Sequence, residues 1–405
     1  MTVAVLGGGI QGCSVALELA ERGFRVDLFD SAPSLLTAAS RHNEGKIHLG
    51  YVYSADETLR TAALMARGAA VFGSSLRRWL GADFDSIAIS TPFNYAVHRN
   101  SMRTPCELAR TYREISSIVE AEFAGRSCYL GGVVASHVRR LTDSELDVYG
   151  PNITAGFETA EVAIDPDALA DRLNGVVLAH PRIRVHTSAR VDSVDADRRR
   201  MNVSLGGEPI ESVGPFVHIV NCAWSGRPAI DATTGIHPVG NWSFRMKYFV
   251  RVNLADAAVD VPSTTVVIGS FGDIVDFGEG NFFLSWYPVG RRGWSTELSP
   301  PSWPTDLGEE DGQALALDLL AGFGLVVPGL AELASTHADR CVVRGGVIFA
   351  LGDTDLADPT SRLHERHAIG PHSHGNYHTI DTGKLTVAPL FASIVADRIE
   401  AASRG

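Results

Sequence analysis

The sequence contains few cysteines and no arrangement of them that would build a metal site. Its 405 residues include five cysteines, which stand at Cys13, Cys106, Cys128, Cys222 and Cys341 without any CxxC or Cys/His spacing. An odd and scattered set of this kind predicts reduced thiols in a cytoplasmic protein. We therefore expect neither a disulfide framework nor a zinc site, and no bound metal.

The sequence also lacks long apolar runs and an excess of positive charge. No window approaches the roughly 18 apolar residues of a spanning helix, and no basic stretch or cleavable apolar segment precedes the first predicted strand. The formal net charge is −12 at pH 7. An acidic surface argues against nucleic acid or an anionic membrane as the main partner. It does not exclude an anionic small molecule, because a local Arg or Lys can reverse the field inside a pocket.

What is present is typical of a globular protein of two domains. Hydrophobic residues make up 45% and charged residues 20% of the chain, which suits a substantial core. Apolar periodicity predicts helices over 55–81, 105–124, 310–321 and 384–401, and a further helix beginning at Pro166 with Asp165 as its N-cap. Alternating patterns predict strands over 184–194, 216–221, 244–253 and 264–289. The Gly-, Pro- and Ser-rich residues 290–308 are expected to form a loop.

Residues 3–30 have the pattern of one strand–helix–strand unit with a glycine-rich turn. The turn reads Gly7-Gly8-Gly9-Ile10-Gln11-Gly12, a GxGxxG sequence. Gly7 allows the tight turn, Gly9 lets the backbone approach a pyrophosphate, and Gly12 lets the helix pack against the strand. The helix N-terminus then presents unpaired N–H groups to the phosphates. This unit predicts a dinucleotide site.

The second strand of this unit ends at Asp30, followed by Ser31. A carboxylate in this position accepts hydrogen bonds from ribose hydroxyls and disfavours a 2′-phosphate, which argues against NADP. The motif alone does not distinguish FAD from NAD.

Two further segments are polar and glycine-rich. Residues 39–53 read ASRHNEGKIHLGYVY, and residues 375–386 read GNYHTIDTGKLT before the last predicted helix. We interpret the second segment as another helix N-terminus that suits a phosphate or a flavin.

With these motifs the chain resembles the FAD-dependent oxidoreductases of the D-amino-acid oxidase superfamily. That group includes glycine and sarcosine oxidases, the flavin glycerol-3-phosphate dehydrogenases and L-2-hydroxyglutarate dehydrogenase. The resemblance covers most of the chain in layout, and its specific residues lie in 3–54, around 161–173, at 219–224 and in 340–395. Residues 43–53 are most similar to the hydroxyglutarate dehydrogenase branch, whereas 361–364 and 383–386 are more similar to the glycerol-phosphate branch.

The resemblance implies FAD as the cofactor and a set of contacts to it. Cys222-Ala223-Trp224 departs from the Ala-Thr-Gly-like turn usual in the family, which leaves its local contacts open. The residues expected to contact FAD are Gly7, Gly9, Ile10, Gln11, Gly12, Asp30, Ser31, Ser40, Arg41, Asn43, Val191, Cys222, Ala223, Trp224, Gly375, Asn376, Gly383, Lys384 and Leu385.

The expected fold is α/β, with a Rossmann-type FAD-binding domain and an inserted, mainly antiparallel β-sheet substrate domain. The expected boundaries are 1–85, 155–235 and 338–405 for the first domain, and 86–154 and 236–337 for the second.

Four residues are candidates for the substrate site. The resemblance implies that Arg344 holds a substrate carboxylate, for which a guanidinium has a matching two-pronged geometry. His48 is a candidate base for an alcohol, a flavin contact or a covalent anchor. Alternation puts Arg245 and Lys247 on one face of a strand, where both could bind an acidic substrate or simply face solvent. The histidine-rich residues 364–378 fit no compact metal site and are expected to form a polar loop near the flavin, with His374 or His378 as further candidates.

These observations favour an FAD-dependent oxidoreductase that oxidises a small amine or amino acid by hydride transfer to flavin N5. One alternative is a dehydrogenase of 2-hydroxy acids, which requires a base. Another is a flavin-binding protein without catalysis. The expected partner is a small molecule carrying an anionic group, and oxygen, a quinone or another protein are all open as electron acceptors.

Overall fold

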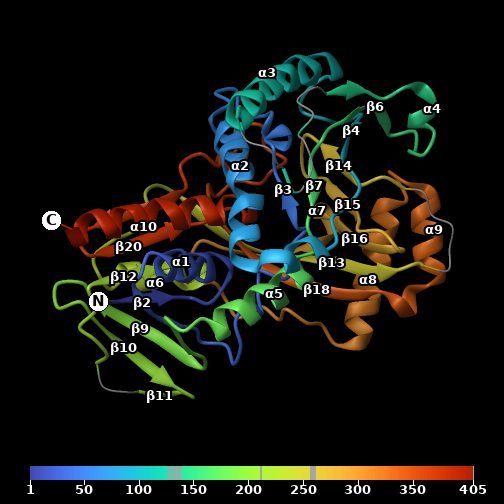
Figure 1. The fold of residues 1–405 in the computed structure, drawn as a ribbon. Coiled ribbons are helices and arrows are strands. Elements are labelled where there is room, and N and C mark those ends of the chain that lie inside the picture. The colour runs from blue at the N-terminus through green and yellow to red at the C-terminus, as the bar shows by residue number, and fades with distance from the viewer. Residues whose placement is uncertain (126–128, 131–133, 135–137, 210–211, 256–260, 405) are drawn as a thin grey trace.

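The protein is built around two β-sheets that lie side by side (Figure 1). The computed structural model describes residues 1–404 apart from 126–128, 131–133, 135–137, 210–211 and 256–260, so Cys128 lies outside the described residues. None of the helices formed by the described residues is both long and apolar enough to cross a membrane.

The first sheet is the predicted nucleotide-binding sheet. Its strands, in spatial order, are β19 (Gly370–His374), β20 (Tyr377–Asp381), β12 (His218–Asn221), β1 (Thr2–Leu6), β2 (Arg25–Phe29) and β8 (Ile183–His186). All neighbours are parallel except β19, which pairs antiparallel with β20. The carboxyl ends of the parallel strands therefore meet at one edge, where open α/β sheets bind ligands.

Each face of this sheet is covered by a different layer. Val3 and Val5 of β1 pack with one group of helices, namely α1 (Ile10–Glu21), α2 (Arg60–Leu80), α5 (Pro166–Ala179) and α10 (Ala388–Arg404). Ala4 and Leu6 face the opposite layer, formed by α6 (Arg227–Ala232) and the small sheet of β9 (Ala189–Asp195), β10 (Arg200–Leu205) and β11 (Glu208–Pro209). The strand reads as a continuous apolar run because both faces are buried.

The second sheet is largely antiparallel and larger. Its strands, in spatial order, are β17 (Arg291–Ser295), β13 (Trp242–Asn253), β16 (Asn281–Trp286), β15 (Gly272–Asp276), β14 (Thr264–Val267), β4 (Asn94–His98), β6 (Ile153–Glu158) and β5 (Arg139–Arg140), with β18 (Val342–Leu351) also paired with β13. One pair, β14 with β4, is parallel. The long strand β13 thus contacts three other strands and is fixed along its length.

Helices and short connections complete the second sheet. The helices α7 (Tyr287–Gly290), α8 (Glu309–Phe323) and α9 (Pro328–Thr336) lie together beside β13 and β16 (Figure 1). The remaining elements are α3 (Pro105–Phe123), α4 (Asp143–Leu146) and the short pair β3 (Lys46–Ile47) with β7 (Val162–Ala163). The fold is therefore the predicted α/β class with a parallel and a largely antiparallel sheet.

The strand assignments show where the chain crosses from one sheet to the other. β6 and β18 belong to the second sheet, although residues 155–235 and 338–405 were assigned to the first domain. Along the chain β6 precedes α5, which packs on the first sheet, and β18 precedes β19 and β20 of that sheet, so the sequence pattern alone does not mark the passage between the sheets.

Several local expectations are confirmed by the element bounds. Helix α5 begins at Pro166, and the Asp165 carboxylate accepts hydrogen bonds from the amides of Asp167 at 2.8 Å and Ala168 at 3.3 Å, which is the geometry of an N-cap. Helices α2, α3 and α8 fall in the predicted windows.

Two expectations were wrong. Residues 290–308 include strand β17, which pairs with β13 despite its glycine content. Residues 376–386 open the last helix only at their end, because 377–381 form strand β20, while a 3-10 turn at Leu385–Val387 leads directly into α10 at Ala388. The β-branched and aromatic residues of 377–380 favour a strand, which outweighs the helix-start signal of the glycine that follows them.

The close approach of Gly12 to Gly7 yields a prediction on stability. A Cβ at Gly12 would lie 1.8 Å from the Gly7 carbonyl oxygen, so Gly12→Ala must displace helix α1 from β1. We expect a loss of about 1–3 kcal/mol in the free energy of unfolding, as in overpacked cores. Gly175→Ala in α5 is the matched control, because no atom lies within 4 Å of its Cβ position and alanine there favours the helix. Thermal unfolding of both variants measures this, and equal midpoints would contradict the steric argument.

Candidate functional site

A cavity of about 890 Å³ lies between the two sheets. Its walls include Leu6 and Phe29 at the carboxyl ends of β1 and β2, and Cys222 directly after β12. The opposite wall comes from β13 and from 346–348 of β18. The cavity therefore occupies the edge at which the topology of the parallel sheet predicts a ligand.

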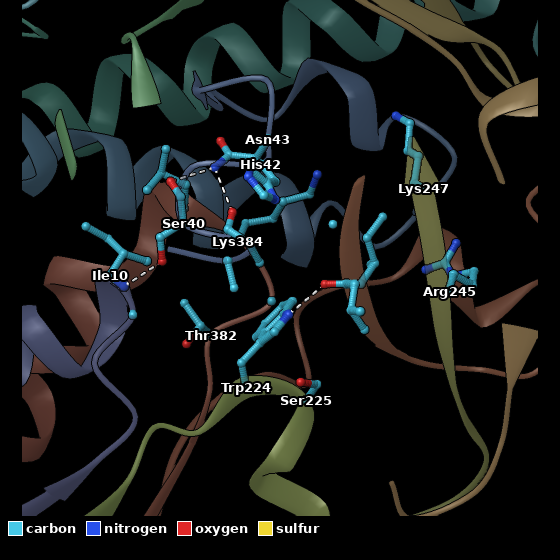
Figure 2. A pocket seen from close by; sticks show the side chains of 18 of the residues that line it. Ile10, Ser40, His42, Asn43, Trp224, Ser225, Arg245, Lys247, Thr382 and Lys384 are labelled. Atoms are coloured by element: carbon cyan, nitrogen blue, oxygen red, sulfur yellow. Dashed lines mark hydrogen bonds between the residues drawn. The ribbon is translucent and has the colours of Figure 1, made fainter. Parts of the chain in front are cut away.

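The glycine-rich turn forms one end of this cavity. Gly7 has a φ of +94°, and a Cβ there would lie 2.7 Å from the carbonyl oxygen of Cys222. Only glycine combines this backbone conformation with so close an approach. The amide of Ile10, the first residue of α1, donates to the Ser40 hydroxyl at 2.8 Å, so residues 39–43 lie over the helix N-terminus (Figure 2).

The Asp30 carboxylate orders the same end of the cavity. Its Oδ2 accepts from the Gly8 amide at 2.5 Å and its Oδ1 from the Ala32 amide at 2.7 Å. Asp30 thus connects the end of β2 to the glycine-rich turn while it lines the cavity.

Most of the residues singled out from the sequence line this one cavity. They are Gly7, Gly9, Ile10, Gln11, Asp30, Ser31, Ser40, Asn43, His48, Val191, Cys222, Ala223, Trp224, Arg245, Lys247, Gly383, Lys384 and Leu385. The Trp224 indole donates to the Val347 carbonyl at 2.7 Å (Figure 2). This hydrogen bond connects the Cys222-Ala223-Trp224 turn, which differs from the turn usual in the family, to β18.

Four residues expected to contact the cofactor do not line the cavity. Gly12 instead packs against Gly7, as its steric role requires. The Arg41 guanidinium turns away and pairs with Asp171 of α5. Gly375 and Asn376 lie in the β19–β20 turn, at the end of β20 opposite to the cavity. This placement follows from residues 377–381 being a strand.

Arg344 is likewise outside the cavity, contrary to its expected role as a carboxylate clamp. Its side chain is 42% exposed and pairs with Asp306 at 2.9 Å. Strand β18 reaches the cavity two to four residues later, through 346–348. The structure therefore contains a surface ion pair at Arg344 in place of the expected substrate contact.

The histidine-rich segment is only partly at the cavity. His364 lines it, but His374 and His378 do not. His378 is buried in the first sheet, where its Nε2 lies 3.0 Å from Nδ1 of His218. Within the described part of the chain, no three His, Cys, Asp or Glu side chains are grouped to hold a metal ion.

The cavity wall opposite the glycine-rich turn carries two buried arginines. Arg245 is 1% exposed, and its Nη1 donates to the Tyr287 hydroxyl at 3.1 Å. Its Nε and Nη2 have no hydrogen-bond partner among the described residues. Arg366 is 8% exposed, and among the described residues its guanidinium donates only to the Phe349 carbonyl, at 3.4 Å. Burial and the neighbouring Arg245 lower the pKa of Arg366 to about 10. Two adjacent guanidinium groups with free donors are suited to bind an anion.

Sequence analysis missed Arg366. It stands among the histidines of 364–378, and no spacing rule connects it to Arg245 across 121 residues of chain. Only the folding of Arg362–His364 against β18 brings the two together.

Three lysines surround the middle of the cavity, together with two carboxylates. The Lys46 ammonium lies 2.8 Å from Asp273, and the Lys384 ammonium lies 3.4 Å from Glu44. Burial opposes ionisation of Glu44, but Lys384, His48 and Lys247 together hold the pKa of its carboxyl well below the usual range. Lys247 has no hydrogen bond or ion pair within the described residues, and burial lowers the pKa of its ammonium.

His48 is almost fully buried behind the cavity wall. The ring is 3% exposed, with Nδ1 at 3.4 Å from Glu161 and Nε2 at 3.8 Å from Glu44. Neither contact has hydrogen-bond geometry. The histidine is therefore at the cavity but held between two carboxylates.

The parallel sheet, its glycine-rich turn and the facing antiparallel sheet define a dinucleotide-dependent oxidoreductase. Residues 2–294 match the family model described as FAD dependent oxidoreductase (DAO), and the chain belongs to this family. The protein is therefore an FAD-dependent oxidoreductase, and the alternative of a flavin-binding protein without catalysis is set aside.

Solved structures share this fold over nearly the whole chain. Glycine oxidase from Geobacillus kaustophilus is 16% identical, with a TM-score of 0.66 over 98% of this chain and 94% of that one. Iminodiacetate oxidase from Chelativorans sp. BNC1 is 18% identical, with a TM-score of 0.66 over 98% and 95%. L-α-glycerophosphate oxidase from Mycoplasma pneumoniae is 16% identical, with a TM-score of 0.62 over 98% and 94%. At these identities the likeness establishes the fold alone.

One curated protein matches a short part of the chain. An FAD-dependent monooxygenase from Fusarium mangiferae is 40% identical over 53 residues, which are 13% of this chain and 14% of that protein. The match thus spans about one seventh of the length of the curated relative.

The position of Asp30 yields a prediction on FAD retention. Because Asp30 holds the amides of Gly8 and Ala32 at the cavity, Asp30→Ala should loosen the turn and lower the affinity for FAD on the order of ten-fold, the effect of one charge-assisted hydrogen bond. Asp27→Ala is the control, since Asp27 lies on the same strand but pairs with His186 outside the cavity. FAD content after dialysis measures the effect, and equal retention by both variants would contradict it.

Proposed function

We propose that the enzyme oxidises a small amine or amino acid whose carboxylate is bound by Arg245 and Arg366. The observation that carries the proposal is the pair of buried guanidinium groups at the cavity, of which Arg245 has two nitrogen atoms without a partner. Buried cations without counterions are costly unless a ligand supplies the charge. The names of the structural neighbours glycine oxidase and iminodiacetate oxidase agree with an amine that carries a carboxylate.

In this proposal the two ends of the cavity have different tasks. The turn at Gly7 and Gly9, the N-terminus of α1 and Ser40 line one end of the cavity and would hold the pyrophosphate of FAD, whereas Gly383, Lys384 and Leu385 would contact the flavin. The absence of a side chain at Gly7 lets a pyrophosphate come close to the backbone of the turn. The free donors of Arg245 suit the substrate.

The residues of the second sheet position the substrate. Arg245 and Arg366 bind the carboxylate in two-pronged geometry, and the Tyr287 hydroxyl fixes the Arg245 guanidinium. Phe249 and Phe283, stacked at 4.6 Å between ring centroids, form an apolar wall that excludes water. FAD supplies the redox chemistry, because the flavin accepts two electrons and the hydrogen of the substrate C–H bond. The amine must bind in its neutral form, because the lone pair of its nitrogen forms the C=N bond as the hydride leaves, and the product is an iminium ion.

A dehydrogenase of 2-hydroxy acids is the second candidate, and the observation in its favour is His48. Oxidation of an alcohol requires removal of the hydroxyl proton, and a histidine at the cavity could accept it. The placement of the ring opposes this role, because it is 3% exposed and lies between two carboxylates at 3.4 and 3.8 Å rather than open to a substrate hydroxyl. We therefore rank it below the amine.

The first test is anaerobic reduction of the holoenzyme. Amines and amino acids should bleach the flavin absorption band at about 450 nm, whereas 2-hydroxy acids should not. Bleaching by hydroxy acids alone would move the function to the second candidate. In that case His48→Gln should lower kcat by about 10²–10⁴, the usual contribution of a general base.

The second test compares two arginines. Arg245→Met should raise the apparent KM for an amino acid by about 10–100-fold, because one charge-assisted contact is lost. Arg344→Met should leave KM unchanged, since its side chain pairs with Asp306 outside the cavity. Steady-state kinetics with the best substrate measures both. The opposite result, with KM raised only by Arg344→Met, would return the clamp to Arg344.

A further inference from the structure

The cavity carries more positive charge than one carboxylate would balance. Lys46 and Lys384 already have carboxylate partners, Asp273 and Glu44. Arg190, also at the cavity wall, pairs with Asp192 at 2.8 Å. The other three cations of the wall, Arg245, Arg366 and Lys247, have no ion pair within the part of the chain that the structure describes. A single carboxylate at the two arginines would leave Lys247 without a counter-charge.

Arg245 and Lys247 stand two residues apart on the same strand, β13, which sets the separation of their Cα atoms. Both side chains leave β13 on the side of the cavity (Figure 2), and Met246 between them faces the opposite core. Residues two apart on a strand are separated by about 6.6 Å, from a rise of about 3.3 Å per residue. β13 is paired on both sides here, since Lys247 stands opposite Gly346 of β18 and Arg291 of β17. The two cations are therefore presented by a fixed backbone on one wall of the cavity, as two separate anion sites.

We propose that the substrate carries two carboxylates, as in an acidic amino acid. The carboxylate next to the amine is bound by Arg245 and Arg366, and the second carboxylate is bound by Lys247. This inference rests on the proposed function, because it specifies which amine the enzyme accepts.

The acidic residues nearby do not occupy the Lys247 site. Asp273 and Glu44 both influence Lys247 through space, but each lies against another lysine, at 2.8 Å and 3.4 Å respectively. The Lys247 ammonium keeps its donors for a ligand. A carboxylate brought to it also favours the charged form of a lysine that burial disfavours.

The test uses substrate pairs that differ only in the second carboxylate. Aspartate is compared with asparagine, and glutamate with glutamine, each as both enantiomers, on the FAD-loaded full-length enzyme. The quantity measured is the concentration that gives half of the maximal rate of anaerobic flavin bleaching. Lys247→Met, Lys247→Arg and the control Arg292→Met are measured alongside. Arg292 lies on the surface, pairs with Asp318 at 3.4 Å and does not line the cavity.

In the wild type the amides should require concentrations about 10–100-fold higher than the acids, the effect of one charge-assisted contact. Lys247→Met should remove this difference by weakening the acids alone. Lys247→Arg should keep most of it, and Arg292→Met should match the wild type. Equal concentrations for acids and amides in the wild type would overturn the inference. So would a Lys247→Met variant that weakens acids and amides equally, because Lys247 would then act on the flavin or the fold.

Ligands that cannot be oxidised separate this inference from the proposed function. Glutarate and butyrate differ by one carboxylate, and their binding is followed by the shift they cause in the flavin spectrum. If no amine bleaches the flavin but glutarate binds more tightly than butyrate through Lys247, the amine function fails and the two anion sites stand. If amines bleach the flavin and glutarate has no advantage, only the two-carboxylate inference fails. If neither occurs, both fail.

Discussion

The close contact between the start of helix α1 and the end of β1 is the constraint on which the rest of the site depends. The Gly7 carbonyl fills the space where Gly12 would carry a Cβ, and Gly7 itself lies against the Cys222 carbonyl. Two strand ends and a helix N-terminus are thereby held within a few ångströms of one another. Ser40 and Asp30 then bond directly to this turn. The cavity has a rigid end because glycine removes the side chains that would keep these backbones apart.

The other end of the cavity depends on the alternation of side chains along a single strand, β13, whose successive residues point to opposite faces. In β13, Arg245, Lys247 and Phe249 face the cavity, whereas Met246, Tyr248 and Val250 belong to the core against α8. The same twelve residues therefore build the second core and present its charged groups. Burying Arg245 without a carboxylate partner is unfavourable for the fold in isolation, and such conflicts are expected where a site binds a ligand.

The sequence was sufficient for the class of fold and for the nucleotide end, because both follow from local patterns. The GxGxxG turn, Asp30 and the cap at Asp165 each involve residues close in the chain. The prediction that Arg245 and Lys247 share one face likewise depends only on the alternation within a single strand, β13. What failed depends on distant segments: Arg366 meets Arg245 only in three dimensions, and Arg344 lies two residues before the point where β18 reaches the cavity. The error at Gly375 and Asn376 came from a local ambiguity, since a glycine after a polar run suits a helix start and a strand end equally.

The order of the strands has a consequence for synthesis of the protein on the ribosome. The first sheet takes β1 from residues 2–6 and β20 from residues 377–381, and α10 packs on α1. Gly383 and Lys384, which line the cavity, also emerge late. A nascent chain that already contains the glycine-rich turn thus lacks one edge of its sheet and part of its cofactor cavity until the last segment is made. Contacts so distant in sequence form slowly, because the intervening loop must be closed first. The cofactor can therefore be enclosed only after translation has passed residue 384, so a prematurely terminated product has no complete site in which to retain it.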